Sequence, residues 1–199
     1  MQENEIFYPT SQTEWRQWLL ENHVSKQSVW LVFYKKTSAK PSITWSEAVD
    51  EALCFGWIDS KRISIDQEKS HQFFSKRKAI STWSRINKEK VEKLIANEQM
   101  TPEGFKCIEI AKQNGSWTIL DEVEELIIPK DLEVAFKTKP NSIDYFLGLN
   151  KSIRKAMLQW LVLAKRPETR QKRISEIVEL AEKNKNQNSL DSQTIFAPI

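Results

Sequence analysis

The sequence predicts an α+β fold in which a small, mostly antiparallel sheet flanked by helices precedes an all-helical part. Two runs rich in β-branched and aromatic residues, 28–34 and 57–66, are typical of strands. Beyond residue 79 the apolar residues recur only at helical spacing. The chain of 199 residues has just four glycines and seven prolines, which favours helices over a turn-rich β-sandwich.

The first helix and the first strand follow from local patterns. The segment Ser11–Glu14 has the form of a capping box, with a hydroxyl at the N-cap and a carboxylate three residues later. Trp15, Trp18 and Leu19 follow at positions i, i+3 and i+4, which predicts the apolar face of one helix. Nearly every side chain of 28–34 is apolar, so we expect this strand in the centre of the sheet.

The second helix and a hairpin are predicted next. A second capping box, Thr44–Glu47, begins a helix that ends at Gly56, because glycine tolerates the positive φ common at helix ends. The chain leaves this glycine as strand 57–66 and returns from His71. We expect the two strands to form an antiparallel hairpin with a basic end.

The remaining elements are predicted helices. Thr101 followed by Pro102 is typical of an N-cap and a first helical residue. This helix is predicted to face inward through Phe105, Ile108 and Ala111. Further helices are expected to begin near residues 84–87, 129, 141, 150 and 167.

The length suits one generous domain or two small ones. We predict a sheet-containing part over residues 1–80 and a helical part over residues 81–183. The polar residues 184–199 are predicted to form a flexible tail.

Charge is distributed unevenly, although the net charge is only +3. Segments 61–90 and 151–173 are rich in Lys and Arg, and the segment 121–125 between them is acidic. The basic segments are either ordinary solvated faces or the two walls of an anion site where they converge. The small net charge does not by itself predict a nucleic-acid-binding protein.

Cysteine usage and hydropathy indicate the compartment. Cys54 and Cys107 lie in apolar, helix-like contexts without a CxxC pattern, which favours buried free thiols over a disulfide. The N-terminal residues form no apolar signal-peptide region, and no apolar run approaches the ~18 residues that span a bilayer. We expect a cytoplasmic protein without a transmembrane segment.

Metal and cofactor patterns are lacking in the sequence. His23 and His71 are far apart, and neither has a second His or Cys at ligand spacing. The four glycines are too scattered to form a phosphate-binding loop. We therefore expect no metal and no cofactor.

Asp59 is the first candidate for a functional residue. In a regular strand its side chain shares a face with Lys61, two residues on. Arg62, Arg77 and Arg85 are further expected partners. Three interpretations stay open: a structural salt bridge or turn cap, one wall of a polar pocket, or a general acid or base.

Two other segments combine polar and aromatic groups. Trp83, Ser84 and Asn87 lie where the sheet-containing part meets the helices, and they are either a helix cap with a core Trp or an anion site at a helix N-terminus. Arg170 lies one helical step before Arg173, and it binds either an acidic side chain or an anionic ligand.

These motifs resemble one known family. The resemblance rests on four blocks: Trp15-x-x-Trp18-Leu19, the run from Glu47 through Gly56-Trp57-Ile58-Asp59-Ser60, Trp83-Ser84-x-x-Asn87-Lys88, and Ala164-Lys165-x-x-Glu168-Thr169-Arg170. They are similar to the YdeI/OmpD-associated family, whose members are also called bacteriocin-protection proteins. The resemblance covers roughly residues 7–183, and it implies a YdhG-like fold for the first part and a small helical module after it.

The resemblance implies a role in protection against bacteriocins or cationic peptides, and it assigns no mechanism and no catalytic residue. We predict a non-enzymatic stress or envelope-protection protein that binds an anionic or peptide ligand in a cleft. One alternative is a nucleic-acid-binding module that uses the basic hairpin and Trp83, and another is an enzyme that uses Asp59. The predicted ligand-binding residues are Trp57, Asp59, Arg62, Arg77, Trp83, Ser84, Asn87 and Arg170.

Overall fold

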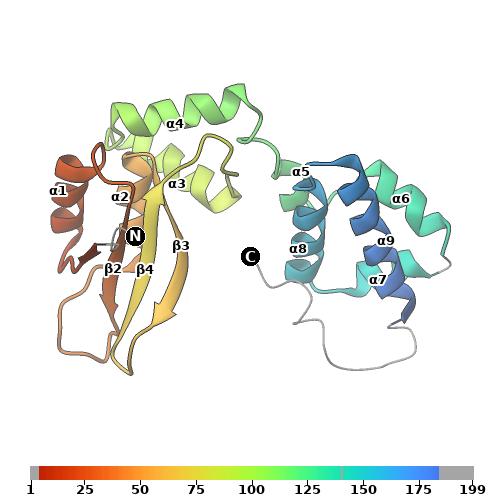
Figure 1. The fold of residues 1–199 in the computed structure, drawn as a ribbon, viewed down its shortest axis with the longest axis horizontal. Helices are drawn as coiled ribbons and strands as arrows, with labels where there is room; N and C mark the ends of the chain where they lie inside the picture. Colours follow the sequence, from red (N-terminus) through yellow and green to blue (C-terminus); the bar gives the residue numbers. More distant parts are fainter. Residues whose placement is uncertain (1–4, 140, 184–199) are drawn as a thin grey trace. The chain divides into compact units, whose positions relative to one another are not determined.

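The chain divides into two compact units between Thr118 and Ile119. A computed structural model describes residues 5–139 and 141–183 (Figure 1). Each unit has its own hydrophobic core. The boundary predicted between residues 80 and 81 therefore falls inside the first unit, and the predicted tail 184–199 lies outside the described residues.

The first unit contains a four-stranded sheet with the order β1-β2-β4-β3. The strands are β1 (Ile6–Phe7), β2 (Ser28–Tyr34), β3 (Trp57–Ser64) and β4 (Lys69–Lys76). β1 and β2 are parallel, and the other two pairs are antiparallel. The predicted central strand, hairpin and mostly antiparallel sheet are confirmed, and the two-residue β1 is an addition to the predicted set.

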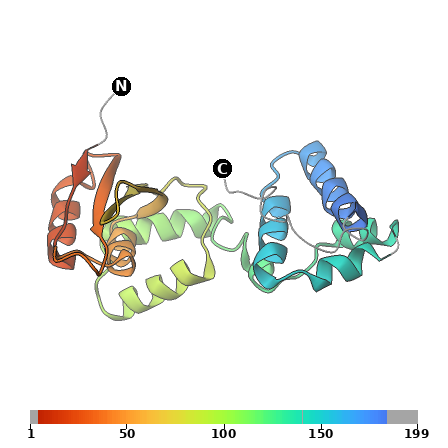
Figure 2. The same cartoon turned by 90° about the horizontal axis from the view of Figure 1, so that it is seen from below.

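Helices α1 (Gln12–Asn22), α2 (Trp45–Cys54), α3 (Arg85–Ala96) and α4 (Pro102–Gln113) complete the first unit. Each begins at a side-chain cap, as the sequence patterns predict, and the capping residues are Ser11, Thr44, Ser84 and Thr101. Figure 2 shows α2, α3 and α4 on one side of the strands. Phe105 on α4 is 42% exposed, which corrects its predicted inward orientation, whereas Ile108 and Ala111 are buried.

Helices and one sheet face share a single core in the first unit. The largest side chains of that core that are fully buried include Trp15, Trp57, Phe74 and Trp83. Helix α4 approaches the end of α2 so closely that a Cβ on Gly104 would lie 2.3 Å from the Cys54 carbonyl oxygen. Gly56 has φ +70°, the left-handed conformation that lets the chain turn directly from α2 into β3.

Helices are the only regular elements among the described residues of the second unit. It contains α5 (Asp121–Glu124), α6 (Lys130–Lys137), α7 (Ser142–Gly148), α8 (Lys151–Val162) and α9 (Pro167–Lys183). Its core includes Leu132, Phe136, Phe146, Leu158 and Ile177. The α+β fold with an all-helical C-terminal part is thus confirmed. In the described part of the chain, no helix is long and apolar enough to cross a membrane.

Candidate functional site

Asp59 connects β3 to α2 and β4. Its Oδ2 atom accepts hydrogen bonds from the indole Nε1 of Trp45 at 2.9 Å and from the amide Nε2 of Gln72 at 3.1 Å. Gln72 is only 4% exposed, and its Nε2 also donates to the Ser60 carbonyl at 2.9 Å. Asp59 therefore holds Trp45 in place through neutral donors, where the sequence predicted a cationic partner.

A β-bulge interrupts β3 between Asp59 and Arg62. Arg62 pairs with Gln72 and donates from Nε and Nη2 to the Ser70 hydroxyl at 2.9 and 2.7 Å. Lys61 points to the opposite sheet face, where its ammonium lies over two aromatic rings. The prediction that Lys61 shares a face with Asp59 is wrong, because the bulge breaks the two-residue alternation.

Arg62 lines a cavity of about 430 Å³ at the beginning of α2, which we call the cationic pocket. Four cations line it, and none of its described lining residues is acidic. Its members are Phe33, Tyr34, Lys35, Lys36, Ser38, Lys40, Ser42, Ile43, Thr44, Trp45 and Arg62. Within the described residues, none of the four cations forms an ion pair with a carboxylate.

The loop between β2 and α2 builds most of this pocket. The Ser42 hydroxyl accepts from the Tyr34 backbone N–H at 3.1 Å, which folds the loop back onto the strand. The Lys40 ammonium lies 4.7 Å from the Tyr34 ring centroid and donates to the Tyr34 hydroxyl at 3.4 Å. This contact with Tyr34 raises the pKa of Lys40, so the lysine is charged at neutral pH.

The N-terminus of α2 also lies at this pocket, through Thr44 and Trp45. The Thr44 side chain accepts from the Glu47 backbone N–H, and the Glu47 carboxylate accepts from the Thr44 N–H at 2.8 Å and from its hydroxyl at 2.7 Å. The first turn of a helix carries partial positive charge, which adds to the field of the lysines. The charge of Glu47 offsets part of that contribution.

Arg77 and Trp83 form a buried stack in the first unit. The guanidinium carbon of Arg77 lies 3.6 Å from the centroid of the Trp83 ring, and Nη1 donates to the Thr82 carbonyl at 2.9 Å. Burial lowers the pKa of Arg77 to about 10. Trp83 is 1% exposed and packs on Trp117 with ring centroids 4.9 Å apart. These contacts give the pair a packing role.

Three other predicted residues of the first unit have visible structural roles. Trp57 is fully buried and packs edge-on against Trp18. Ser84 caps α3 by accepting from the Asn87 backbone N–H at 3.3 Å. Of the eight predicted residues, Arg62 lines the cationic pocket. Asp59 contacts the wall of the pocket through its hydrogen bond with Trp45. The other six are not among the lining residues. Ligand binding by any of the predicted residues stays a prediction.

Arg170 belongs to the second unit and forms a bidentate ion pair. Its Nε and Nη2 atoms lie 2.5 and 2.9 Å from the Asp131 carboxylate oxygens. Hydrogen bonding from Arg170 lowers the pKa of Asp131. Arg170 thus binds an acidic side chain, which is the first of the two interpretations of its sequence context. The two basic segments lie in different units, and their convergence stays a prediction.

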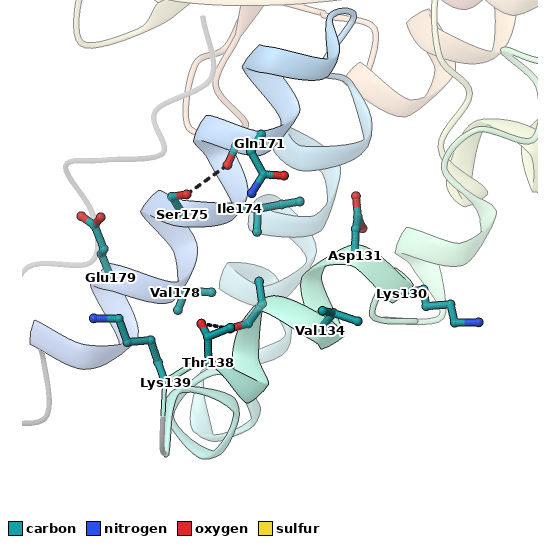
Figure 3. Close-up of a pocket in the computed structure, with 11 residues that line it drawn as sticks. Lys130, Asp131, Val134, Thr138, Lys139, Gln171, Ile174, Ser175, Val178 and Glu179 are labelled. Carbon is teal, nitrogen blue, oxygen red and sulfur yellow. Dashed lines mark hydrogen bonds between the residues drawn. The ribbon is translucent and has the colours of Figure 1, made fainter.

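A groove of about 740 Å³ lies between α6 and α9 in the second unit. Figure 3 shows Val134, Ile174 and Val178 along its floor, and Lys130, Asp131, Lys139 and Glu179 around it. We call it the α6–α9 groove. The sequence does not reveal this groove, because its apolar residues match the ordinary core spacing of two helices.

The comparisons with known proteins follow the division into units. Residues 7–107 match a domain of unknown function (DUF8412), and residues 125–184 match the family described as "Bacteriocin-protection, YdeI or OmpD-Associated". The chain belongs to the DUF8412 family and contains a YdeI/OmpD-associated domain. Searches of curated proteins and of solved structures returned no match.

The predicted YdeI/OmpD-associated family is therefore confirmed, through the match in the second unit. The block around Gly56 and Asp59, which suggested that family, lies within the DUF8412 match instead. The YdhG-like fold of the first part stays a prediction. The description of that family names bacteriocin protection, which points to an envelope- or stress-related role for the family.

Proposed function

We propose that this YdeI/OmpD-associated protein is a non-enzymatic, cytoplasmic stress-protection protein whose cationic pocket binds an anionic ligand. The supporting observation is the convergence of four cations without an ion-paired carboxylate among the described residues. A volume of about 430 Å³ also lies within the range of small-molecule sites, roughly 300–1,000 Å³.

The chemistry of the lining favours an oxyanion. The planar guanidinium of Arg62 can donate two parallel hydrogen bonds to a phosphate or carboxylate, and lysine ammonium groups supply point charges. Lys35 and Lys36 are exposed, so they can move onto such a group at small cost. The ring of Trp45, 45% exposed and fixed by Asp59, offers a flat apolar wall for the rest of the ligand.

The charge of the pocket also distinguishes between the two predicted classes of ligand, an anionic molecule and a peptide. A cationic peptide is repelled by a lining of four positive charges, whereas an anionic ligand is attracted. Protection that acts through this pocket therefore depends on a phosphate- or carboxylate-bearing molecule. The alternative nucleic-acid site at Trp83 loses its aromatic platform, because that ring is buried in the core.

Isothermal titration calorimetry with pyrophosphate tests the proposal. We expect the wild type to bind and the triple variant Lys35→Ala/Lys36→Ala/Arg62→Ala to bind more than about tenfold more weakly, a loss of about 1.4 kcal/mol. The matched control is Lys78→Ala/Lys93→Ala/Lys106→Ala, which removes the same charge from exposed positions of the same unit. Equal losses in both variants, or no binding by the wild type, would reject a site in this pocket.

A further inference from the structure

The outer face of the sheet, opposite the helices, carries a cluster of aromatic side chains. Trp30 and Phe73 are direct partners across β2 and β4, with ring centroids 5.0 Å apart. The His71 ring lies 6.5 Å from Trp30. These residues alternate with Leu31 and Phe74, which belong to the core, so the rings point away from the helices.

Lys61 lies directly above this cluster. Its ammonium is 5.3 Å from the Trp30 ring centroid and 5.6 Å from that of Phe73. The β-bulge of β3 turns this lysine onto the outer face. Ile6, opposite Trp30 and 59% exposed, and Ile63, opposite His71 and 42% exposed, extend the surface on either side.

The strands carry almost no negative charge. Asp59 is the single acidic residue in the four described strands, and its carboxylate bonds Trp45 and Gln72 on the inner side. The outer face therefore combines two aromatic rings with Lys61, and Asp66 of the adjoining turn is paired with Lys69. Sheets that bind single-stranded nucleic acid combine aromatic rings, on which unstacked bases stack, with cationic groups.

We propose that this outer face binds single-stranded nucleic acid. Bases stack on Trp30 and Phe73, and the ammonium of Lys61 moves from the rings to a backbone phosphate. Trp30 and Phe73 are half-buried, so part of each side chain is exposed to solvent. This site is separate from the cationic pocket and uses none of its lining residues.

The charge of the face distinguishes this occupant from a protein. A second copy docked through the same face would bring one Lys61 against another, and Asp66 of the neighbouring turn is already paired with Lys69. An apolar protein surface would leave the ammonium buried without a counter-charge. A nucleic-acid strand supplies one phosphate for each base that it stacks.

Fluorescence polarisation with a labelled thymidine strand of about 12 nucleotides tests the proposal. We expect the wild type to bind at low salt and to weaken steeply as salt rises, because counterions are released. Lys61→Glu should bind at least about tenfold more weakly. Lys106→Glu, the same change at an exposed position on α4, should bind like the wild type.

A second variant tests stacking. Trp30→Ala/Phe73→Ala should bind about 100-fold more weakly if both rings hold a base. The exposed Lys61→Glu keeps the test decisive if this double variant does not fold. The pocket variant Lys35→Ala/Lys36→Ala/Arg62→Ala should retain most strand binding, and Lys61→Glu should retain pyrophosphate binding, so the two proposals fail independently.

Three outcomes would overturn the inference. The first is no binding of the strand by the wild type at low salt. The second is equal weakening in Lys61→Glu and Lys106→Glu, which would indicate unspecific attraction to positive charge. The third is sedimentation showing that the wild type self-associates and Lys61→Glu does not, because a second copy would then cover the face.

Discussion

The α6–α9 groove and the cationic pocket differ in the sign and pairing of the charges that line them. The α6–α9 groove of the second unit is the larger, yet it has an apolar floor and lining charges of both signs, and its Asp131 is already paired with Arg170. The cationic pocket of the first unit is smaller, but its four cations have one sign and no ion-paired carboxylate among the described residues. Volume alone therefore does not identify the binding site, because the sign and pairing of the lining charges determine which ligand gains free energy on binding.

The largest expected effect is on the stability of the first unit, and it tests whether the two units unfold independently. Gly104→Ala should lower the free energy of unfolding of the first unit by about 3 kcal/mol, because the new methyl would overlap the Cys54 carbonyl. Tryptophan fluorescence during urea denaturation reports on it, since seven of the eight tryptophans lie in the first unit.

Gly148→Ala is the matched control in the second unit, because its Cβ would meet no atom within 4 Å. It should change stability by less than about 0.5 kcal/mol. Hydrogen exchange of the second unit should be unaltered by Gly104→Ala. If exchange accelerates equally in both units, they do not unfold separately.

Charge reversal compares the two cavities directly. Lys35→Glu/Lys36→Glu should weaken pyrophosphate binding about 100-fold, because attraction turns into repulsion of about 1 kcal/mol or more per charge. Lys130→Glu/Lys139→Glu, the same change at the α6–α9 groove, should leave binding within about twofold. Similar losses at both cavities, measured by calorimetry, would remove the distinction.

Asp59→Ala should loosen the wall of the cationic pocket. It removes the charged acceptor of Trp45 and Gln72, and we expect a loss of about 2 kcal/mol in unfolding free energy with anion binding a few-fold weaker. Asp59→Asn keeps an acceptor oxygen and should be milder in both measurements. An unchanged affinity in Asp59→Ala would show that the position of Trp45 does not matter for binding.

The smallest effect tests the ion pair beside the α6–α9 groove. Arg170 lowers the pKa of Asp131 in the folded state, so the pair stabilises above the unfolded pKa of Asp, about 4, and this contribution is lost as the pH falls through the lower folded value. Both side chains are partly exposed, which limits the contribution to about 0.5 kcal/mol. Arg170→Gln should reduce stability at pH 6 and have little effect near pH 2, as measured by denaturation.

Local sequence patterns were sufficient for most elements of the fold. Ser11, Thr44, Thr101 and Asn150 each cap the helix that they were predicted to begin, because a cap depends on residues within one turn. The two residues of β1 carry no pattern of their own, and their pairing with β2 depends on residues more than twenty positions away. Helices α3 and α4 join the core of the sheet through long-range packing, which no local pattern indicates.

The candidate site was predicted only in part. Arg62 and Asp59 were selected from the sequence, but the cationic pocket depends on a loop, residues 35–42, that has no regular period. The partners Trp45 and Gln72 could not be foreseen, because each reaches Asp59 through the tertiary fold. The sheet face of Lys61 was predicted wrongly because of the β-bulge. One additional residue in a strand changes the face on which the following side chains lie.

The most direct test of the anion site is a backbone amide NMR titration with pyrophosphate. Our account predicts chemical-shift changes concentrated in residues 35–45 and at Arg62, with the amides of α6 and α9 unchanged. Changes confined to α6 and α9, or none at all at millimolar pyrophosphate, would contradict the assignment of the cationic pocket as the binding site.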